Sequence, residues 1–271
     1  MTIFLGLPVG RIRVLSDRMR VVLAMFAVGV LAFIFVDVMG HANGIVEEAL
    51  TGYKDGSGSL GRLLAYGALL LAGFVSGCAG LTAIERRMRL SADLPAIAGG
   101  SDAAVLHAES LPTARGHDEA RQRVLRRAMV IAIAIGLHNF AEGLAIGVSA
   151  RAGEVSLATV LVIGFALHNA TEGFGIVGPL GSVTPSWGWL ALAGLVGGGP
   201  TFAGSMLGYE VTSQPLELAF YSLAGGAILY VVCEILHGVR RYGHRELAAI
   251  VLACGFAAGV VTDLVVVYGG G

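Results

Sequence analysis

Charged side chains are scarce in this chain of 271 residues, because Asp, Glu, Lys and Arg together make up only 14% of it. Soluble domains carry about 25% charged residues, so a chain this poor in charge cannot cover a water-facing surface. The rest of the composition agrees, since 55% of the residues are hydrophobic and the mean hydropathy is +0.77. These values argue against a soluble enzyme and a disordered chain, and they favour a membrane protein.

A strong net charge and a cysteine framework are also missing. The formal net charge of −1 gives no electrostatic case for a nucleic acid or another polyanionic partner. The three cysteines, Cys78, Cys233 and Cys254, lie scattered in apolar runs and are too few for a disulfide framework. Glycine, in contrast, is abundant at 41 residues, which suits closely packed membrane helices.

Seven apolar runs are long enough to cross a bilayer as helices, which takes about 20 residues. They comprise residues 21–40, 63–84, 128–150, 155–178, 187–209, 218–236 and 247–268. An eighth apolar stretch, residues 1–10, covers only about 15 Å at the helical rise, and it lacks the basic region of a signal peptide. We therefore expect an all-α polytopic membrane protein of eight transmembrane helices, the first of them short or incomplete.

Basic residues alternate sharply between the two sides of this arrangement. The first, third and seventh loops contain fifteen of the 18 Lys and Arg residues. The positive-inside rule therefore places these loops in the cytoplasm and both termini outside. We expect residues 1–271 to form a single transmembrane domain of the plasma (inner) membrane, with residues 85–127 as a long cytosolic loop. The charged end of that loop, residues 118–127, is expected to begin the following helix.

The apolar run at residues 187–209 contains a sequence that disfavours a regular helix near its middle. Three consecutive glycines, beginning at Gly197, precede Pro200 there. Proline removes a backbone hydrogen bond and crowds the preceding turn, so we expect a break or a kink at this point.

Five carboxylates fall inside the apolar runs, and each costs roughly 2.5–3.5 kcal/mol at the bilayer centre. They are Asp37, Glu142, Glu172, Glu234 and Asp263. The runs contain no lysine or arginine at the same depth to neutralise them. A cation supplied from outside the chain is the simplest counter-charge, and protonation of the carboxylates is the competing explanation.

Two of these carboxylates belong to an internal repeat. His138, Asn139, Glu142 and Gly143 recur 30 positions later as His168, Asn169, Glu172 and Gly173. The spacings of three and four residues place the imidazole, amide and carboxylate of each copy on one helix face. Both copies lie near the middle of their runs, and the short loop at residues 151–154 makes the two helices antiparallel neighbours. We therefore expect the two copies to face each other at one depth.

Two imidazoles, two carboxylates and two amides together suit a divalent transition metal. Imidazole favours zinc and iron, and carboxylate favours harder ions such as manganese. The set contains no thiolate, which argues against a dedicated Cu(I) carrier. Interhelical hydrogen bonds that only hold the helices together are the alternative interpretation. The presence of two matched copies favours a functional site.

Four further residues are candidates for a metal pathway. Glu234 and His237 are three residues apart near the cytosolic end of the apolar run at residues 218–236, where they form either a release-side relay or a water-exposed helix end. Asp37 and His41 are four residues apart near the outer end of the second span. They are candidates for collecting cations at the entrance. Acidic residues are common in outer loops, however, and an ordinary acidic loop without this role is the favoured interpretation.

The paired His-Asn-x-x-Glu-Gly motifs resemble the metal-binding signature of the ZIP family of divalent-metal transporters. The resemblance implies a three-plus-two-plus-three helix arrangement, metal import to the cytosol and an elevator-like movement of one bundle against another. It also implies that four residues form the main metal site, His138, Glu142, His168 and Glu172, with Asn139 and Asn169 at neighbouring positions.

The chain departs from the family pattern at several of these positions. Ala141 and Thr171 replace prolines of many relatives, while Asn169 and Gly199 replace acidic residues. The loss of both carboxylates leads us to expect one well-occupied ion.

We therefore expect a transporter and not an enzyme. The chain has no Walker-type phosphate loop, which argues against direct ATP use and favours a secondary transporter. Zinc is the expected transported substrate, with iron, manganese, cobalt, nickel and cadmium as alternatives. The expected partners are metal ions and the lipid bilayer, and a homodimer is left open. The competing function is an intramembrane metal-dependent hydrolase, against which the chain lacks an HExxH motif.

Overall fold

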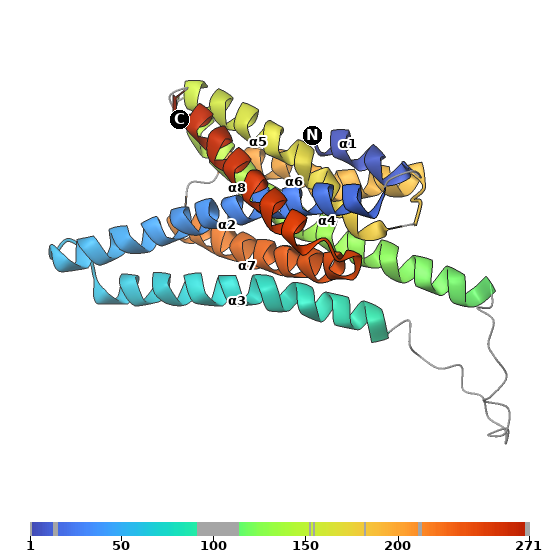
Figure 1. Ribbon diagram of the computed structural model, residues 1–271. Helices are drawn as coiled ribbons and strands as arrows, with labels where there is room; N and C mark the ends of the chain where they lie inside the picture. The colour runs from blue at the N-terminus through green and yellow to red at the C-terminus, as the bar shows by residue number, and fades with distance from the viewer. Residues whose placement is uncertain are drawn as a thin grey trace, which may run out of the picture.

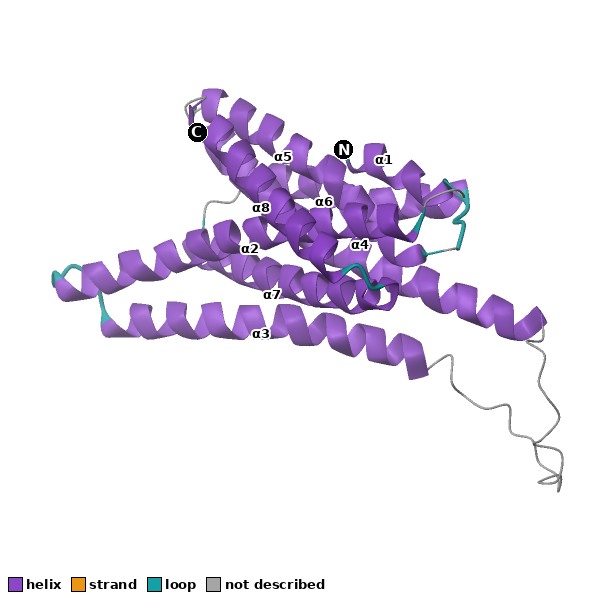
Figure 2. Cartoon of the chain, in the orientation of Figure 1, coloured by secondary structure: helices purple, strands orange, loops and turns teal. Residues whose placement is uncertain are grey.

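The computed structural model describes residues 2–12, 16–90, 114–151, 153, 155–181, 183–210 and 213–268. These residues form helices and short connections, with no strand among them (Figure 2). A short N-terminal helix, α1 (Ile3–Gly6), continues as a 3-10 helix (Leu7–Arg11). The long helices are α2 (Asp17–Lys54), α3 (Leu60–Leu90), α4 (Ala114–Arg151), α5 (Val155–Val177), α6 (Trp187–Glu210), α7 (Gln214–Val239) and α8 (Arg245–Tyr268). The all-α prediction is confirmed.

Seven helices in the described part of the chain are long and apolar enough to cross a membrane, and they are α2 to α8. The first segment predicted from the sequence is helical but too short to be one of them. Its side chains Ile3 and Leu7 are nevertheless fully buried, because α1 packs against α5 and α6.

Several helices extend beyond the apolar runs that predicted them. Helix α2 starts after Ser16, whose side chain accepts a hydrogen bond from the Met19 backbone N–H, and it continues to Lys54. Helix α4 begins at Ala114, so the charged end of the long loop is helical as predicted. The Gly- and Pro-containing part of that loop, residues 91–113, lies outside the described residues.

The expectation of a break in the run at residues 187–209 is wrong, whereas a kink there stays a prediction. Helix α6 is continuous from Trp187 to Glu210 with Pro200 inside it. Pro200 has no backbone N–H, so one hydrogen bond of the helix is missing here. A side chain of α4 supplies a donor nearby, because Asn139 Nδ2 donates to the Gly197 carbonyl at 2.8 Å. Packing against α4 therefore holds a sequence that would be a poor helix by itself.

The contacts between the helices divide them into two bundles. Figure 1 shows α3 beside α7 in one of them and α1 near α5 and α6 in the other. The α4 bundle contains α1, α4, α5 and α6, and its most extensive contact is between α4 and α6. The α2 bundle contains α2, α3, α7 and α8, in which α3 packs on α7 and α8 packs on α2. The bundles meet where α4 contacts α7 and where α5 contacts α2 and α8.

Within each bundle, glycines allow helix backbones to approach very closely. A Cβ on Gly29 of α2 would lie 2.1 Å from the carbonyl oxygen of Leu252 in α8. A Cβ on Gly143 of α4 would lie 2.1 Å from the carbonyl oxygen of Thr201 in α6. Among the described glycines, every such clash under 3.0 Å with the backbone of another helix occurs inside one bundle. At the boundary, a Cβ on Gly178 would meet only Ala24 of α2, at 3.3 Å. The bundles are thus joined internally by backbone contact and to each other by side chains.

Candidate metal site

The two sequence repeats meet in the interior of the molecule, between the central turns of α4 and α5. Glu142 and Asn139 of α4 are 4% and 0% exposed, and Glu172 and Asn169 of α5 are 1% and 8% exposed. Two carboxylates and two amides therefore lie together with almost no contact with solvent, in an environment where every polar group needs a partner.

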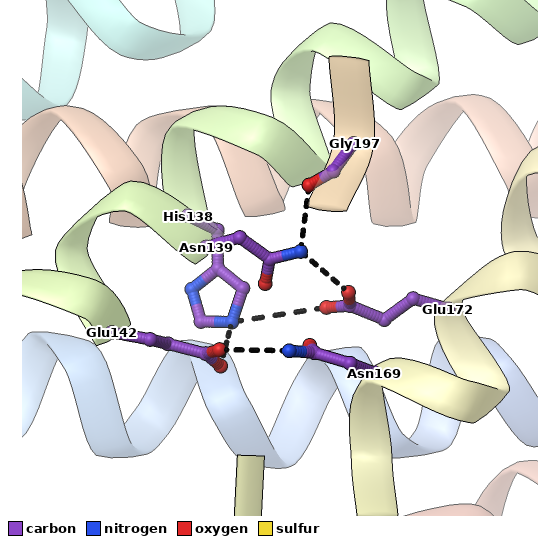
Figure 3. A network of polar contacts seen from close by, with 6 residues as sticks. All are labelled: His138, Asn139, Glu142, Asn169, Glu172 and Gly197. Atoms are coloured by element: carbon purple, nitrogen blue, oxygen red, sulfur yellow. Dashed lines mark hydrogen bonds and ion pairs between the residues drawn. The ribbon is translucent and has the colours of Figure 1, made fainter. Parts of the chain in front are cut away.

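The amides and carboxylates are paired reciprocally across the two helices. Asn139 Nδ2 donates to Glu172 Oε2 at 3.2 Å, and Asn169 Nδ2 donates to Glu142 Oε2 at 3.2 Å (Figure 3). This arrangement requires the two repeats to face each other at the same level, which is the arrangement that their spacing predicts.

His138 lies between the two carboxylates. Its Nε2 atom is 2.8 Å from Glu142 Oε1 and 3.8 Å from Glu172 Oε1, and the side chain is 1% exposed. One imidazole therefore contacts the acidic residue of its own helix and that of the neighbouring helix, as Figure 3 shows.

The orientation of the Asn139 amide follows from its second contact. The Gly197 carbonyl can only accept a hydrogen bond, so the nitrogen of the amide must face it. The Oδ1 atoms of Asn139 and Asn169 are both buried and accept no hydrogen bond from the described residues. A buried acceptor without a donor costs free energy, and an amide oxygen in this condition is a suitable ligand for a cation.

The second predicted imidazole, His168, lies in α5 one position before Asn169, and its side chain is outside the described part of the structure. In the part that is described, no group of three or more His, Cys, Asp and Glu side chains is arranged to hold a metal ion. The described groups are instead held together by the asparagine amides.

A cavity of about 490 Å³ leads to this cluster from between the two bundles. His138 and Glu142 line it near the middle of α4, and Asp37 and His41 line it from α2. His41 Nδ1 is 3.7 Å from Asp37 Oδ1, and their side chains are 60% and 38% exposed. The cavity therefore connects the exposed pair Asp37 and His41 with the buried His138 and Glu142, which the sequence identified separately.

Glu217 and Tyr221 also line this cavity, and the sequence interpretation missed both. Helix α7 begins at Gln214, four positions before the apolar run starts, with Pro215 in its first turn. Proline fits the first turn of a helix, so this Pro was the signal that placed Glu217 on the helix. Tyr221 lies one turn later, and its ring centroid is 5.7 Å from that of His41. Asp263, one of the five carboxylates inside the apolar runs, lines the same cavity from α8.

Glu234 and His237 are not brought to the site. Both lie in the last turns of α7, about 20 Å further along the helix than Tyr221. Glu234 is half-buried and His237 is exposed, and neither lines the cavity that reaches His138.

Comparison with known proteins identifies the family. No curated protein matches the chain. The family model described as ZIP Zinc transporter matches residues 97–262, which is more than half of the chain and includes both repeats and the helices that carry them. ZIP proteins transport divalent metals across membranes, and the apolar helices described above make this chain an integral multi-pass membrane protein. The chain belongs to the ZIP zinc transporter family.

Proposed function

We propose that this protein imports a divalent transition metal, zinc in the first place, into the cytosol. The transported ion binds between α4 and α5, where His138, Glu142, His168 and Glu172 supply the main ligands and Asn139 and Asn169 supply amide oxygens. The observation that carries this proposal is the reciprocal pairing of two buried His-Asn-x-x-Glu segments at one level. Membership of the family favours this function over the hydrolase alternative.

The donor set supports one dication. Two buried carboxylates balance a doubly charged ion, and imidazole and amide oxygen complete the coordination without a thiolate. Zinc, iron and manganese all accept such ligands, so the geometry of the loaded site and metal supply decide among them. Position 199, beside the Gly197 carbonyl, is a glycine and brings no further carboxylate. We therefore propose a single ion in this site.

The arginines support the proposed orientation. Arg11 donates to the carbonyl of Pro185, Arg20 to that of Gly181, and Arg121 to that of Thr184. All three arginines come from loops assigned to the cytosol. They meet at the α5–α6 connection, which as the fifth loop lies on the same side of the membrane in the expected topology. The exposed residues of the cavity, Asp37 and His41, lie about 25–30 Å further along α2 than Arg20, past the middle of the helix.

Together these contacts support an outward-facing state in which the cavity opens away from the cytosol. On the cytosolic side, Arg20 of the α2 bundle is bonded to Gly181 of the α4 bundle, and the space beside Arg20 and Gly178 amounts to only about 10 Å³. Import then requires the α4 bundle to move against the α2 bundle until the site opens to the cytosol. The glycine contacts inside each bundle and the side-chain boundary between them support such a movement as two rigid bodies.

The direction of transport follows from the membrane potential. A doubly charged ion that enters an inward-negative cell gains about 4.6 kcal/mol per 100 mV. A metal gradient and this potential drive import without ATP.

Metal flux into proteoliposomes with an enclosed fluorescent zinc indicator tests the proposal. The variants are Glu142→Gln and Glu172→Gln, which remove one charge at nearly constant volume. The matched control is Glu246→Gln, at an exposed glutamate in the first turn of α8. We expect each site variant to lower zinc uptake about tenfold or more, since even the supporting partners of a metal ligand are worth that much. Equal uptake by the wild type and both site variants would contradict the site assignment.

A further inference from the structure

The two asparagines have a contact that metal binding does not explain. In the described structure their nitrogens, not their oxygens, face the glutamates, and each contact crosses between α4 and α5. We propose that Asn139 and Asn169 act as substitutes for the metal while the carrier is empty, and so permit the empty α4 bundle to return across the membrane. This inference rests on the transport function proposed above.

A carrier of this kind makes two different crossings in each cycle. In the loaded crossing, the dication compensates Glu142 and Glu172. In the return crossing the same two side chains have no ion. In the described structure they are 4% and 1% exposed. Buried carboxylates that lack donors are strongly unfavourable, so the return needs donors from the protein itself.

The amides supply these donors at both glutamates. Each asparagine NH₂ gives one carboxylate a charge-assisted hydrogen bond from the facing helix, and the two distances are equal at 3.2 Å. The hydrogen bond of Asn139 to Gly197 also anchors that amide to α6, so three helices of the α4 bundle are tied together. A bundle connected in this way moves as one unit when no ion connects it.

An amide can serve both states of the site. Its nitrogen donates to a carboxylate when the ion is absent, and its oxygen is a ligand when the ion is present. The Oδ1 atoms of Asn139 and Asn169, which accept no hydrogen bond from the described residues, fit this second use. A carboxylate at either position would still bind a cation, but it would supply no donor to Glu142 or Glu172.

Two transport assays on one proteoliposome preparation separate the two crossings. Net zinc uptake into metal-free vesicles requires the empty carrier to return, whereas exchange of isotopic zinc between zinc-loaded compartments does not. The variants are Asn139→Asp and Asn169→Asp, which keep the side-chain shape and remove the donor. Asn169→Leu removes the donor without adding charge, and Asn169 has no bond to Gly197. Ser222→Ala is the control, because Ser222 is fully buried and bonds only within α7, to Leu218.

We expect all three asparagine variants to lower net uptake by at least about tenfold, the usual effect of losing a hydrogen bond to a buried charge. Net uptake should fall more than exchange in the two Asp variants, because they keep an oxygen that can bind the ion. Asn169→Leu also removes that oxygen and should lower both rates, and the control should change neither rate. If net uptake and exchange fell equally in the two Asp variants, the asparagines would have a structural or ligand role only. If neither fell, they would have no role in the return. A wild-type protein without net uptake or exchange would overturn the proposed transport itself, and the inference with it.

Discussion

Single residues decide the chemistry of this protein, because two carboxylates are buried where they need a partner at every moment. Glu142 and Glu172 each have an amide donor from the opposite helix and share the His138 ring. A change to any side chain of this set leaves another buried polar group without its hydrogen-bond partner. Binding at this set of side chains therefore depends on the charge of the ion or proton that binds there.

Acid should suppress metal uptake, because protons and metal compete for the same atoms. Carboxylates bind a metal when deprotonated, and imidazole binds it when neutral. Protons therefore compete with the metal for the carboxylates of Glu142 and Glu172. We expect initial zinc uptake in proteoliposomes to decline steadily between pH 7.5 and pH 5 at constant free zinc. A steady increase in uptake over this range would show that carboxylate ligation does not control the rate.

Glu217 should assist capture of the ion without taking part in its final coordination. It lines the cavity beside Tyr221, on the way to Glu142. Removal of one negative charge from such a cavity lowers the local cation concentration, so Glu217→Gln should raise the KM for zinc about two- to fivefold at low ionic strength and leave the maximal rate unchanged. Glu47→Gln is the matched control. Glu47 accepts a hydrogen bond from Asn43 in the C-terminal half of α2, but it does not line the cavity. An equal effect of both variants would indicate a general surface charge effect.

The spacing of the two repeats predicts that they meet, and the structure brings together His138, Asn139, Glu142, Asn169 and Glu172. The donor direction of the amides was not predictable, because an asparagine sequence position does not reveal which atom faces which partner. Glu217 was missed because the apolar run begins after it. The pathway role of Glu234 and His237 stays a prediction, since both lie far along α7 from the cavity.

At the level of the helices, close backbone packing holds each bundle together. Lipid offers apolar side chains no incentive to associate, so small residues and the van der Waals contacts they permit stabilise helix pairs in membranes. The backbone contact of Gly29 in α2 with Leu252 in α8 is one such site. Gly40, on the same helix, provides an internal comparison, because a Cβ at this position would have no atom of a neighbouring residue within 4 Å.

Gly29→Ala should destabilise the protein, and Gly40→Ala should not. The added methyl group at position 29 would lie 2.1 Å from a carbonyl oxygen, which forces α2 and α8 apart at a cost of about 1–3 kcal/mol. At position 40 the same change meets open space and favours the helix slightly. Thermal unfolding in detergent, followed by fluorescence, should show a midpoint lowered by several degrees for Gly29→Ala only. Identical midpoints would contradict the packing described here.

The helices themselves were predictable from apolar runs, whereas their ends were not. A bilayer-length run identifies the part of a helix in the hydrocarbon, but α2 continues to Lys54 through residues that the aqueous interface tolerates. The continuity of α6 through Pro200 was also beyond sequence reasoning, because contacts with α4 support it. Tertiary packing decided both cases.

In the whole molecule, the site lies in one bundle and its access route lies between the two. The cavity is lined by α2, α7 and α8 on one side and by α4 and α5 on the other. A displacement of the α4 bundle therefore changes the access to His138 and Glu142 without changing the contacts among the site residues. This separation of binding from access is what a membrane carrier requires.

Equilibrium zinc binding to the purified protein tests the central claim most directly, because it requires neither orientation nor movement. Titration calorimetry on the wild type should give one tightly bound ion per chain. The double variant Glu142→Gln/Glu172→Gln should lose this ion, and the control Glu246→Gln should keep it. Wild-type zinc binding by the double variant would contradict the claim that α4 and α5 hold the transported metal between their glutamates.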